Sequence, residues 1–456
     1  MGHRLLLQTI TAAICGLSLA AHPTTAPRPC LSALAAIPRR SSGAPDRPGT
    51  GISVNGRFVA FASSARLVPT DRDSQADIYV LDRETTAVTL ESVVSDAAPR
   101  GGDRQHPSIS GDGRFIVFEA AQRSPGGIDL HVHMQIMLRD RRNGTTRMLS
   151  VGPDGTPGNA TSSNPVVSAD GRVVAFESAA TNLVAGDDPN GGAYDIYVMA
   201  LDTAAIARVS LDDRSRPSPL GFSVSPTISA DGRYVAFTSS AMLDGSLPTP
   251  DRSPNPKPGL PGTQVFVRDL QRGVTERASA AANGRPPNGA SYLPAISGDG
   301  RWVAFVSNAT DLAAGDRNDV SDVYLRDLVT STTRLVSGAG GRAGDGGSTS
   351  PALSQNGRFV AFQSDASDLV CRARCPRADE DVNLVSDVFV FDRDSGLIRR
   401  VSQDPDGGWL ESSVRPAIDP SGRVVVFSSR HPTDEHDLGN DSDLFVWTAC
   451  AGDSGR

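Results

Sequence analysis

Short runs of alternating apolar and polar residues, separated by turn residues, fill most of this chain, and residues 293–337 show the pattern most fully. A period of two over about four to eight residues predicts a β-strand. The pair Asp299-Gly300 between the first two runs is typical of a tight hairpin turn, because glycine adopts the positive φ that such a turn requires. The four runs lie at 293–297, 301–307, 322–327 and 332–337. This segment therefore predicts four short antiparallel strands.

The same arrangement recurs seven times along the chain. In every copy an arginine follows the turn glycine, and a phenylalanine lies four residues after that arginine. The turn glycines are Gly56, Gly113, Gly171, Gly232, Gly300, Gly357 and Gly422, which are 57 to 68 residues apart. Four antiparallel strands per copy predict the blades of a β-propeller. A solenoid is the alternative, but it needs polar caps at both ends.

The two ends of the repeat array predict a closed ring. The seventh copy stops after its third strand, at residues 447–450, and has no fourth. Residues 37–42 resemble the fourth strand of the sixth copy at 398–402, so they can supply the missing strand and leave no open edge. The predicted fold is therefore all-β: a seven-bladed β-propeller of four-stranded antiparallel blades, with the last blade completed by the N-terminal segment.

The first residues predict a secretory signal peptide at 1–21. His3 and Arg4 form a short polar start, and Leu5–Ala21 is mostly apolar but short and interrupted for a membrane span. The remaining divisions are a leader and closing strand at 22–47, the propeller at 48–450 and a tail at 451–456. We expect the mature protein to be secreted or held in the periplasm or cell envelope, without a stable membrane span.

Four cysteines remain after the predicted cleavage. An even number in an exported chain indicates two disulfides, with three pairings open. Cys371 and Cys375 are close enough to staple a local loop. Cys30 and Cys450 would then join the donated strand to the third strand of blade seven. Free buried thiols are the alternative.

The overall composition excludes one class of partner. The 456 residues carry a formal net charge of −8, aromatic residues make up 5%, and no basic stripe is visible, so nucleic acid is not expected as a partner. A closed repeat array can use this length as a single unit, and we expect a monomer.

Two motifs resemble a known family. Ser225–Ser239 is Ser-Pro-Thr-Ile-Ser-Ala-Asp-Gly-Arg-Tyr-Val-Ala-Phe-Thr-Ser, and Asp322–Asp327 is Asp-Val-Tyr-Leu-Arg-Asp. They resemble the repeats of the TolB-type, WD-like propellers, and the resemblance covers about residues 48–450. It implies an exported scaffold or binding module and offers no catalytic residues. TolB itself has a separate α/β domain before a six-bladed propeller, whereas this chain has seven copies.

The loops after the second strands carry a repeated acidic pattern. Oxygen ligands at alternating positions, followed by a further carboxylate, suit Ca²⁺, a hard cation that takes roughly six to eight oxygens. The candidate ligands are Asp316, Asn318 and Asp322 in blade five, Asp71, Asp73 and Asp77 in blade one, and Asp381, Asn383 and Asp387 in blade six. Looser versions are Asp187, Asn190 and Asp195 in blade three and Asp437, Asn440 and Asp443 in blade seven.

Blades two and four lack the acidic pattern and begin their third strand with Gln135 and Gln264 in place of aspartate. The acidic loop and the aspartate at the start of the third strand are therefore present or absent together, and we treat them as one local unit. Its alternative interpretation is structural, since Asp and Asn bond to their own backbone in turns and the spacing lacks the glycine and glutamate of an EF-hand. Ca²⁺ is the one cofactor that the sequence suggests, and turn capping is the alternative.

Four further features have structural explanations. His131 and His133 alternate, so both imidazoles would face one side, but no third metal ligand is apparent. The turn arginines are expected to bond to a neighbouring blade, and the repeat phenylalanines to pack between blades. The proline-rich insert at 248–261 predicts a rigid exposed loop or a partner contact.

The function is predicted from the loops. Those after the second and fourth strands are long and leave a blade on the same side, so this long-loop face is the candidate binding face. Neither a Gly-x-Ser-x-Gly elbow nor a His-Glu-x-x-His motif is present, and no carboxylate pair stands out. We therefore expect a secreted non-catalytic scaffold, not an enzyme, that binds a protein or glycan. The alternative is a secreted propeller hydrolase or lactonase with its active site at the central channel.

Overall fold

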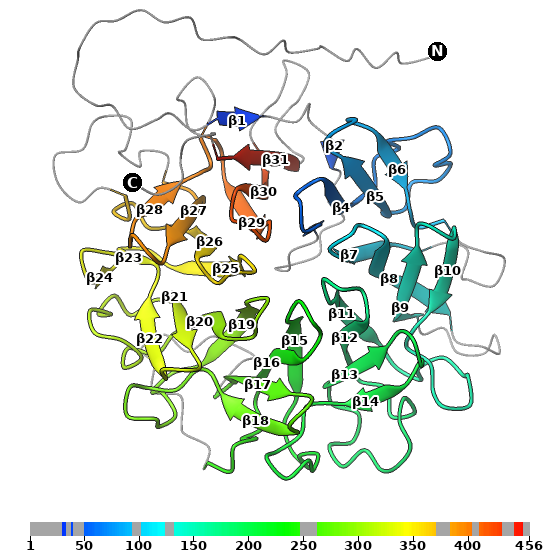
Figure 1. Ribbon diagram of the computed structural model, residues 1–456, viewed down its shortest axis with the longest axis horizontal. Coiled ribbons are helices and arrows are strands. Elements are labelled where there is room, and N and C mark those ends of the chain that lie inside the picture. The colour runs from blue at the N-terminus through cyan, green and yellow to red at the C-terminus, as the bar shows by residue number, and fades with distance from the viewer. Residues whose placement is uncertain are drawn as a thin grey trace, which may run out of the picture.

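Seven antiparallel sheets surround a central axis in the computed structural model (Figure 1). The structure describes residues 30–32, 38–39, 50–93, 102–123, 132–246, 262–370, 384–403, 410–430 and 442–449. Every regular element among these residues is a β-strand, which confirms the predicted all-β, seven-bladed propeller. Accordingly, the described part of the chain contains no helix of the length and hydropathy needed to cross a membrane.

Each blade runs from an inner strand at the axis to an outer strand. Blades one to three are β3 (Thr50–Ile52), β4 (Phe58–Ser63), β5 (Asp77–Asp82), β6 (Val88–Leu90); β7 (Arg104–Ile109), β8 (Phe115–Arg123), β9 (Val132–Asp140), β10 (Thr145–Met148); and β11 (Ser162–Val167), β12 (Val173–Ser178), β13 (Asp195–Ala200), β14 (Ile206–Arg208). Blades four and five are β15 (Ser223–Ile228), β16 (Tyr234–Ser239), β17 (Gln264–Asp269), β18 (Val274–Arg277); and β19 (Ser291–Ile296), β20 (Trp302–Ser307), β21 (Asp322–Asp327), β22 (Thr332–Leu335). Blades six and seven are β25 (Ser348–Leu353), β26 (Phe359–Ser364), β27 (Asp387–Asp392), β28 (Ile398–Arg400); and β29 (Ser413–Ile418), β30 (Val424–Ser429), β31 (Ser442–Thr448). A small hairpin, β23 (Gly338–Ala339) and β24 (Arg342–Ala343), follows blade five.

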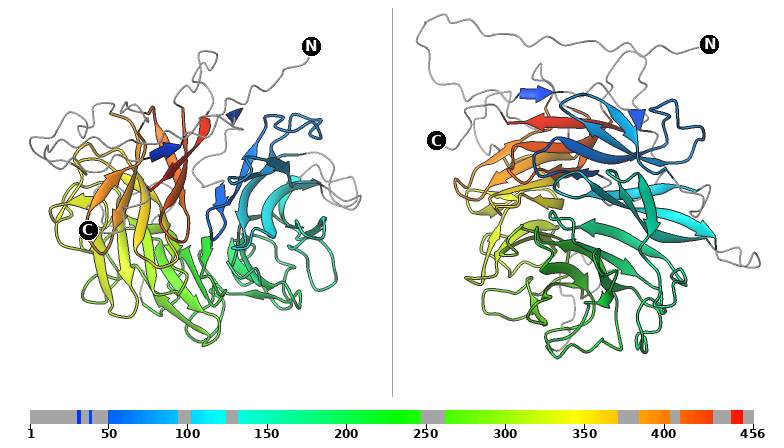
Figure 2. Two further views of the ribbon diagram at one scale, coloured as in Figure 1. Left: turned by 45° about the horizontal axis from the view of Figure 1, so that its top comes forward. Right: turned by 45° about the vertical axis from the view of Figure 1, so that its right-hand side comes forward.

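The N-terminal segment completes blade seven, as predicted. Two short strands, β1 (Cys30–Ser32) and β2 (Pro38–Arg39), pair with β31 in antiparallel register, and both lie beside it in Figure 2. The backbone of Cys30 lies opposite Thr448, two residues before Cys450. Residues 371, 375 and 450 lie outside the described residues, as do the predicted signal peptide at 1–21 and the tail at 451–456, so both disulfides remain predictions.

The hydrophobic core lies between neighbouring blades. One cluster joins Val306 and Val323 of blade five to Val360, Phe362 and Phe389 of blade six, all of them buried. The rings of Phe362 and Phe389 are stacked 5.7 Å apart. Burying an aromatic side chain of this size contributes roughly 1.5–3 kcal/mol. The repeat phenylalanines therefore pack between blades, as predicted.

Each tight turn has space for glycine alone. Gly357 has a φ of 64°, and a Cβ there would lie 2.3 Å from the ring of Trp302 in the preceding blade. The turn aspartate is also held, since Asp299 Oδ1 accepts a hydrogen bond from the backbone N–H of Arg301 at 3.0 Å. The repeated glycine thus permits both the turn and the close approach of adjacent blades.

Five of the seven turn arginines pair with an aspartate of their own blade, so the prediction of bonds to a neighbouring blade was wrong. Arg301 donates two hydrogen bonds to the carboxylate of Asp327, at 2.9 and 2.7 Å. The same bidentate pairs are Arg57–Asp82, Arg114–Asp140, Arg233–Asp269 and Arg358–Asp392. The reason is register: the arginine precedes the second strand, and the aspartate ends the adjacent third strand. Blade three has Ala200 at this position, and Arg172 is 81% exposed.

Backbone hydrogen bonds link successive tight turns around the axis. Val54 N–H donates to Gly111 O at 2.9 Å, and Gln355 N–H donates to Pro420 O at 3.1 Å. The intervening bonds are Gly111 to Ala169, Asp170 to Ala230, Ala230 to Gly298 and Gly298 to Gln355. Pro420 has no N–H to continue the series, so it ends at blade seven.

We expect Arg301→Ala to lower Tm more than Arg172→Ala does. Arg301 holds a bidentate carboxylate and lies 5.0 Å from the ring centroid of Trp302, whereas Arg172 has neither a third-strand aspartate nor a buried position. Scanning calorimetry of the two variants measures the difference. Equal shifts would show that the pair contributes no stability.

The stability of the fold should also depend on pH, because the pair with Arg301 requires Asp327 to be ionised. The hydrogen bonds from Arg301 lower the pKa of Asp327 to about 2, against about 3.9 in an unfolded chain. A pKa depressed by folding stabilises the native state fully above about pH 4, and this contribution is lost as the pH falls towards about 2. Asp327→Asn should lower Tm at neutral pH and flatten the acid side of a Tm-against-pH curve. If the fall of Tm at acidic pH is the same in Asp327→Asn as in the parent protein, the stabilising role of the Arg301–Asp327 pair is contradicted.

Candidate functional site

Two cavities lie along the central axis. The first, of about 200 Å³, is lined by residues near the start of the inner strands of blades one to six, and therefore lies at the long-loop face. The second, of about 170 Å³, lies among the tight turns. Its lining is Ile52, Val54, Ile109, Gly111, Val167, Ala169, Ile228, Ala230, Ile296, Gly298, Leu353, Gln355, Ile418 and Pro420, which includes no titratable side chain. Chemistry in the channel is therefore confined to the first cavity.

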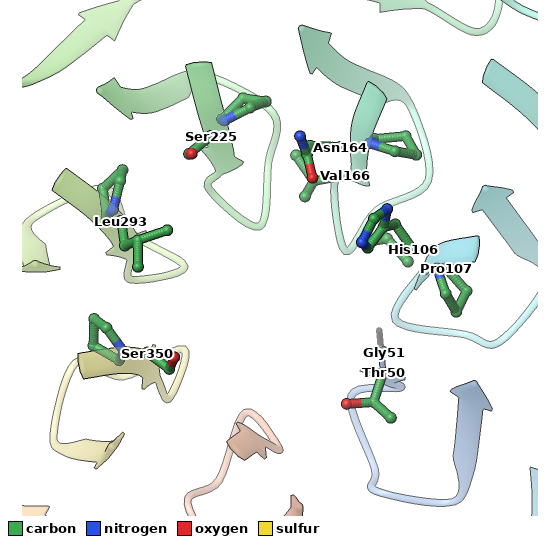
Figure 3. A pocket seen from close by; sticks show the side chains of 14 residues that line it. Thr50, Gly51, His106, Pro107, Asn164, Val166, Ser225, Leu293 and Ser350 are labelled. Carbon is green, nitrogen blue, oxygen red and sulfur yellow. The ribbon is translucent and has the colours of Figure 1, made fainter. Parts of the chain in front are cut away.

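The inner strands carry a bulge that aims side chains at the axis. His106 and Asn164 both have a φ of 51°, and the pairing of their strands with the second strand shifts register there. The equivalent left-handed residues are Ser225, Leu293, Ser350 and Arg415, and each of the six precedes a proline. Five of these side chains surround one opening, from His106 to Ser350 (Figure 3). Such strain costs on the order of 1–3 kcal/mol per residue and is concentrated at functional sites.

Side chains from the preceding blade accept the hydrogen bonds of the bulged backbone. Glu119 Oε1 accepts from the N–H of Asn164 at 2.6 Å, and Glu177 Oε2 accepts from the N–H of Ser225 at 2.6 Å. Both glutamates directly follow the repeat phenylalanine of a second strand. An N–H that the bulge removes from its own sheet is thereby satisfied, as buried donors must be.

His106 is held against one of these carboxylates. Its Nδ1 lies 2.9 Å from Glu119 Oε1, a close contact that does not have the geometry of a hydrogen bond, with the Glu119 side chain 2% exposed and that of His106 18% exposed. The cavity wall thus places an imidazole next to a buried carboxylate. These are the residue types of a general base and its positioning group.

Asn164 connects the two glutamates. Its Nδ2 donates to Glu177 Oε1 at 2.5 Å, while its backbone bonds to Glu119. We call His106, Glu119, Asn164, Glu177 and Ser225 the channel cluster. In blade five the positions of His106 and Glu119 are taken by Leu293 and Val306. The channel mouth is therefore polar on the side of blades two to four and apolar at blade five.

The channel cluster was not predicted from the sequence, because its members lie in different repeats and form no contiguous motif. A signal was nevertheless present. Aligning the seven copies on the turn glycine puts the residue before the inner-strand proline in one column and the residue after the repeat phenylalanine in another. The residue type at both positions differs from copy to copy, although the fold of the blade is the same in each.

The predicted acidic loop of blade one is assembled. One ligand atom from each of Asp71, Asp73 and Asp77 lies within 4.8 Å of the others, an arrangement able to hold a divalent cation. Asp71 also accepts a hydrogen bond from the Tyr79 hydroxyl at 2.6 Å, and Asp77 lies 3.0 Å from the guanidinium of Arg104.

In blade five, Asp316, Asn318 and Asp322 occupy equivalent positions. Asp322 is fully buried, accepts a hydrogen bond from Ser337 at 2.6 Å, and burial raises its pKa to about 7. Asp316 accepts from the Tyr324 hydroxyl. Asp316 Oδ1 and Asp322 Oδ2 are buried without a hydrogen-bond partner among the described residues.

The other predicted ligands are arranged differently. In blade three Asp187 is exposed, and Asp188 takes its place beside Arg208, which lies 3.2 Å from Asp188 and 3.5 Å from Asp195. Asp387 of blade six lies 3.2 Å from Arg400. Asp381, Asn383, Asp437, Asn440, His131 and the insert at 248–261 lie outside the described residues.

Comparisons with solved structures place this fold among known propellers. An oligogalacturonate lyase in complex with manganese matches with a TM-score of 0.51 at 14% identity, over 92% of this chain and 96% of that chain. An oligogalacturonate lyase from Vibrio parahaemolyticus matches with a TM-score of 0.50 at 12% identity, over the same shares. A putative TolB from Agrobacterium tumefaciens has a TM-score of 0.40 at 16% identity, over 81% and 96%. No protein-family model and no curated protein matches the sequence.

These matches overturn the expectation of a non-catalytic scaffold that is not an enzyme. Both lyases match over more than nine-tenths of either chain, so an enzyme is built on this architecture from end to end. The expectation was wrong because it relied on contiguous catalytic motifs, whereas a propeller assembles its channel from single residues of several blades. At these identities the likeness to the two lyases shows the fold alone.

We expect Glu119→Ala to destabilise the protein by about 1–3 kcal/mol, because it leaves the backbone N–H of Asn164 without its acceptor. Glu119→Gln keeps an acceptor oxygen and should cost less. Urea unfolding of both variants measures the two free energies. A Glu119→Ala variant as stable as the parent protein contradicts the capping role.

Proposed function

We propose that the protein is an exported enzyme that carries out acid–base chemistry on a saccharide at the long-loop end of its central channel. The observation that carries the proposal is the pairing of His106 with the buried carboxylate of Glu119 at the wall of the first cavity. The match to lyases over nearly the whole chain supports it.

The roles follow from the geometry of the channel cluster. His106 Nε2 is the proton acceptor, and Glu119 is a positioning residue that acts through the imidazole. Asn164 and Ser225 line the cavity and supply polar contacts, whereas Leu293 offers an apolar surface opposite. Arg415 occupies the equivalent position of blade seven, and its residue type binds carboxylates.

A uronate-containing oligosaccharide is the substrate class that fits these residues and the printed activity of the two similar structures. In the proposed elimination, His106 removes the proton at C5, next to the carboxylate. The electrons of that C–H bond form the C4–C5 double bond, the bond from C4 to the glycosidic oxygen breaks, and the departing oxygen takes a proton from solvent water. His106 then releases the proton that it accepted to solvent. The products are one saturated and one unsaturated fragment.

The manganese of the similar structure has no matching donor set in this channel. Among the described residues that line the first cavity, His106 is the one histidine, and Glu119 Oε1 and both oxygens of Glu177 already accept hydrogen bonds or contact the imidazole. A transition metal needs several uncommitted donors. We therefore assign no step to a metal ion.

Three finer assignments accompany this proposal. The motif pattern supports membership of the TolB-type repeats, the apolar N-terminus supports secretion or a periplasmic location, and the even cysteine count supports disulfides.

We also propose Ca²⁺ as the ion of the acidic loops, supported by the oxygen-only donors and by the grouping of Asp71, Asp73 and Asp77.

The activity test is incubation of the mature chain with oligogalacturonate, followed through the ultraviolet absorbance of the unsaturated product. We expect His106→Gln to lower kcat by roughly a hundredfold or more, the usual contribution of a general base. His133→Gln, a matched change of a histidine in β9 away from the cavity, should keep full activity.

Two outcomes would contradict the proposal. Full activity in His106→Gln would remove the channel cluster from the reaction. New reducing ends without ultraviolet absorbance would exclude elimination and indicate a hydrolase.

A further inference from the structure

Six blades share one device at the start of the third strand. A serine two residues after the end of the outer strand accepts a hydrogen bond from the backbone and donates one to the first side chain of the third strand, as Ser337 does between the Val323 N–H and Asp322. The serine and its acceptor are Ser92 and Asp77, Ser150 and Gln135, Ser210 and Asp195, Ser279 and Gln264, Ser337 and Asp322, Ser402 and Asp387. The device therefore always buries an acceptor, which is either neutral or a carboxylate.

Three of the four blades that bury a carboxylate here also bury an arginine against it. In blades three and six the arginine comes from the outer strand, with Arg208 beside Asp195 and Arg400 beside Asp387. In blade one it comes from the next inner strand, where Arg104 lies 3.0 Å from Asp77. A buried carboxylate without a counter-charge is strongly unfavourable, so this pairing is required.

Blade five is the exception. The residue equivalent to Arg208 and Arg400 is Leu335, and the residue equivalent to Arg104 is Ser348. Its two acids, Asp316 and Asp322, are 5% and 0% exposed, and each has one buried oxygen without a hydrogen-bond partner among the described residues. Blade five thus has the two buried carboxylates, but no arginine at either of the positions that supply one in blades one, three and six.

We infer that blade five binds a Ca²⁺ ion at Asp316, Asn318 and Asp322, in the place that an arginine fills in blades one, three and six. The inference refines the calcium proposal above by naming one blade, and it is independent of the chemistry at the channel. The donors are all oxygens, which selects a hard cation.

The geometry of the repeat supports one shared site. In blade one the equivalent oxygens of Asp71, Asp73 and Asp77 lie within 4.8 Å of one another. The tyrosine contact is equivalent as well, since a third-strand tyrosine donates to the first loop aspartate in both blades. Asn318 takes the middle position of blade five and brings a carbonyl oxygen in place of a carboxylate.

A hairpin found next to blade five encloses the loop. Ala343 N–H at the end of β24 donates to Gly315 O at 3.1 Å, and Asn318 Nδ2 donates to Gly344 O at 2.7 Å. Gly315 has a φ of 98°, and a Cβ there would lie 2.0 Å from Gly341 O. The hairpin therefore brings backbone carbonyls close to Asp316 and holds Asn318 in place.

The test is calorimetric titration of the full mature chain with CaCl₂ after chelation, together with Tm in EDTA and in Ca²⁺. Asp322→Gln is chosen because Gln135 and Gln264 occupy this position naturally, so the variant is expected to fold. Leu335→Arg installs the arginine of blades three and six. Asp73→Ala removes the exposed ligand of the blade-one loop and reports on that loop. Asp319→Asn, which neutralises an exposed carboxylate of the blade-five loop outside the proposed ligand set, is the control.

We expect the parent chain and Asp319→Asn to bind Ca²⁺ equally, with a rise in Tm of several degrees. Asp322→Gln should bind one equivalent less and lose the rise in Tm. Leu335→Arg should also bind one equivalent less, and its Tm in EDTA should exceed that of the parent, because the guanidinium replaces the ion.

Each contrary outcome is distinguishable. Absence of Ca²⁺ binding by the parent chain would overturn both the calcium proposal and this inference, leaving a proton on Asp322 as the alternative. Binding lost in Asp73→Ala but kept in Asp322→Gln would place the ion in blade one and overturn this inference alone. Neither result bears on the activity of the channel.

Discussion

The inner strands of blades two to seven each bend one residue into the left-handed region before a proline, and the N–H of that residue then leaves its own sheet. The packing of neighbouring blades depends on which group accepts the hydrogen bond from this N–H. In blades three and four it is accepted by a glutamate of the preceding blade, so Glu119 and Glu177 satisfy the backbone and join neighbouring blades in one contact. The same bend directs His106 and Asn164 to the axis, so the strained backbone and the polar channel mouth have a common origin.

Equivalent positions in the repeat serve different purposes because the scaffold fixes the backbone and leaves the side chain free to vary. The bulge position holds histidine, asparagine, serine, leucine or arginine without a change of fold. At the start of the third strand, the equivalent serine of each blade donates a hydrogen bond to a glutamine, to an aspartate paired with an arginine, or to an aspartate without an arginine. Charge balance distinguishes these cases: glutamine needs no counter-ion, arginine provides one within the chain, and the acids of blade five keep buried oxygens that have no hydrogen-bond partner among the described residues.

The fold could be predicted from the sequence because local chemistry repeats in it: the Asp299-Gly300 type of turn, the alternation that follows, and the match between 37–42 and 398–402 that closes the ring. The site could not be predicted in the same way. His106 and Glu119 lie 13 residues apart in sequence on two adjacent strands, and Glu119 meets Asn164 only across a blade boundary. The turn arginines were misassigned because a regular repeat does not reveal whether its partner lies in the same blade or the next.

Closure of the ring has a consequence for the order in which the molecule folds. The pairing of β1 with β31 brings Cys30 opposite Thr448, so its loop includes nearly the whole chain, and its entropic cost exceeds that of any contact between adjacent blades. The contacts of the channel cluster span fewer than 50 residues. Contacts close in sequence form faster than distant ones. We therefore expect the hydrogen bonds of the channel cluster to form while the ring is still an open arc, and the two ends to join in a later step.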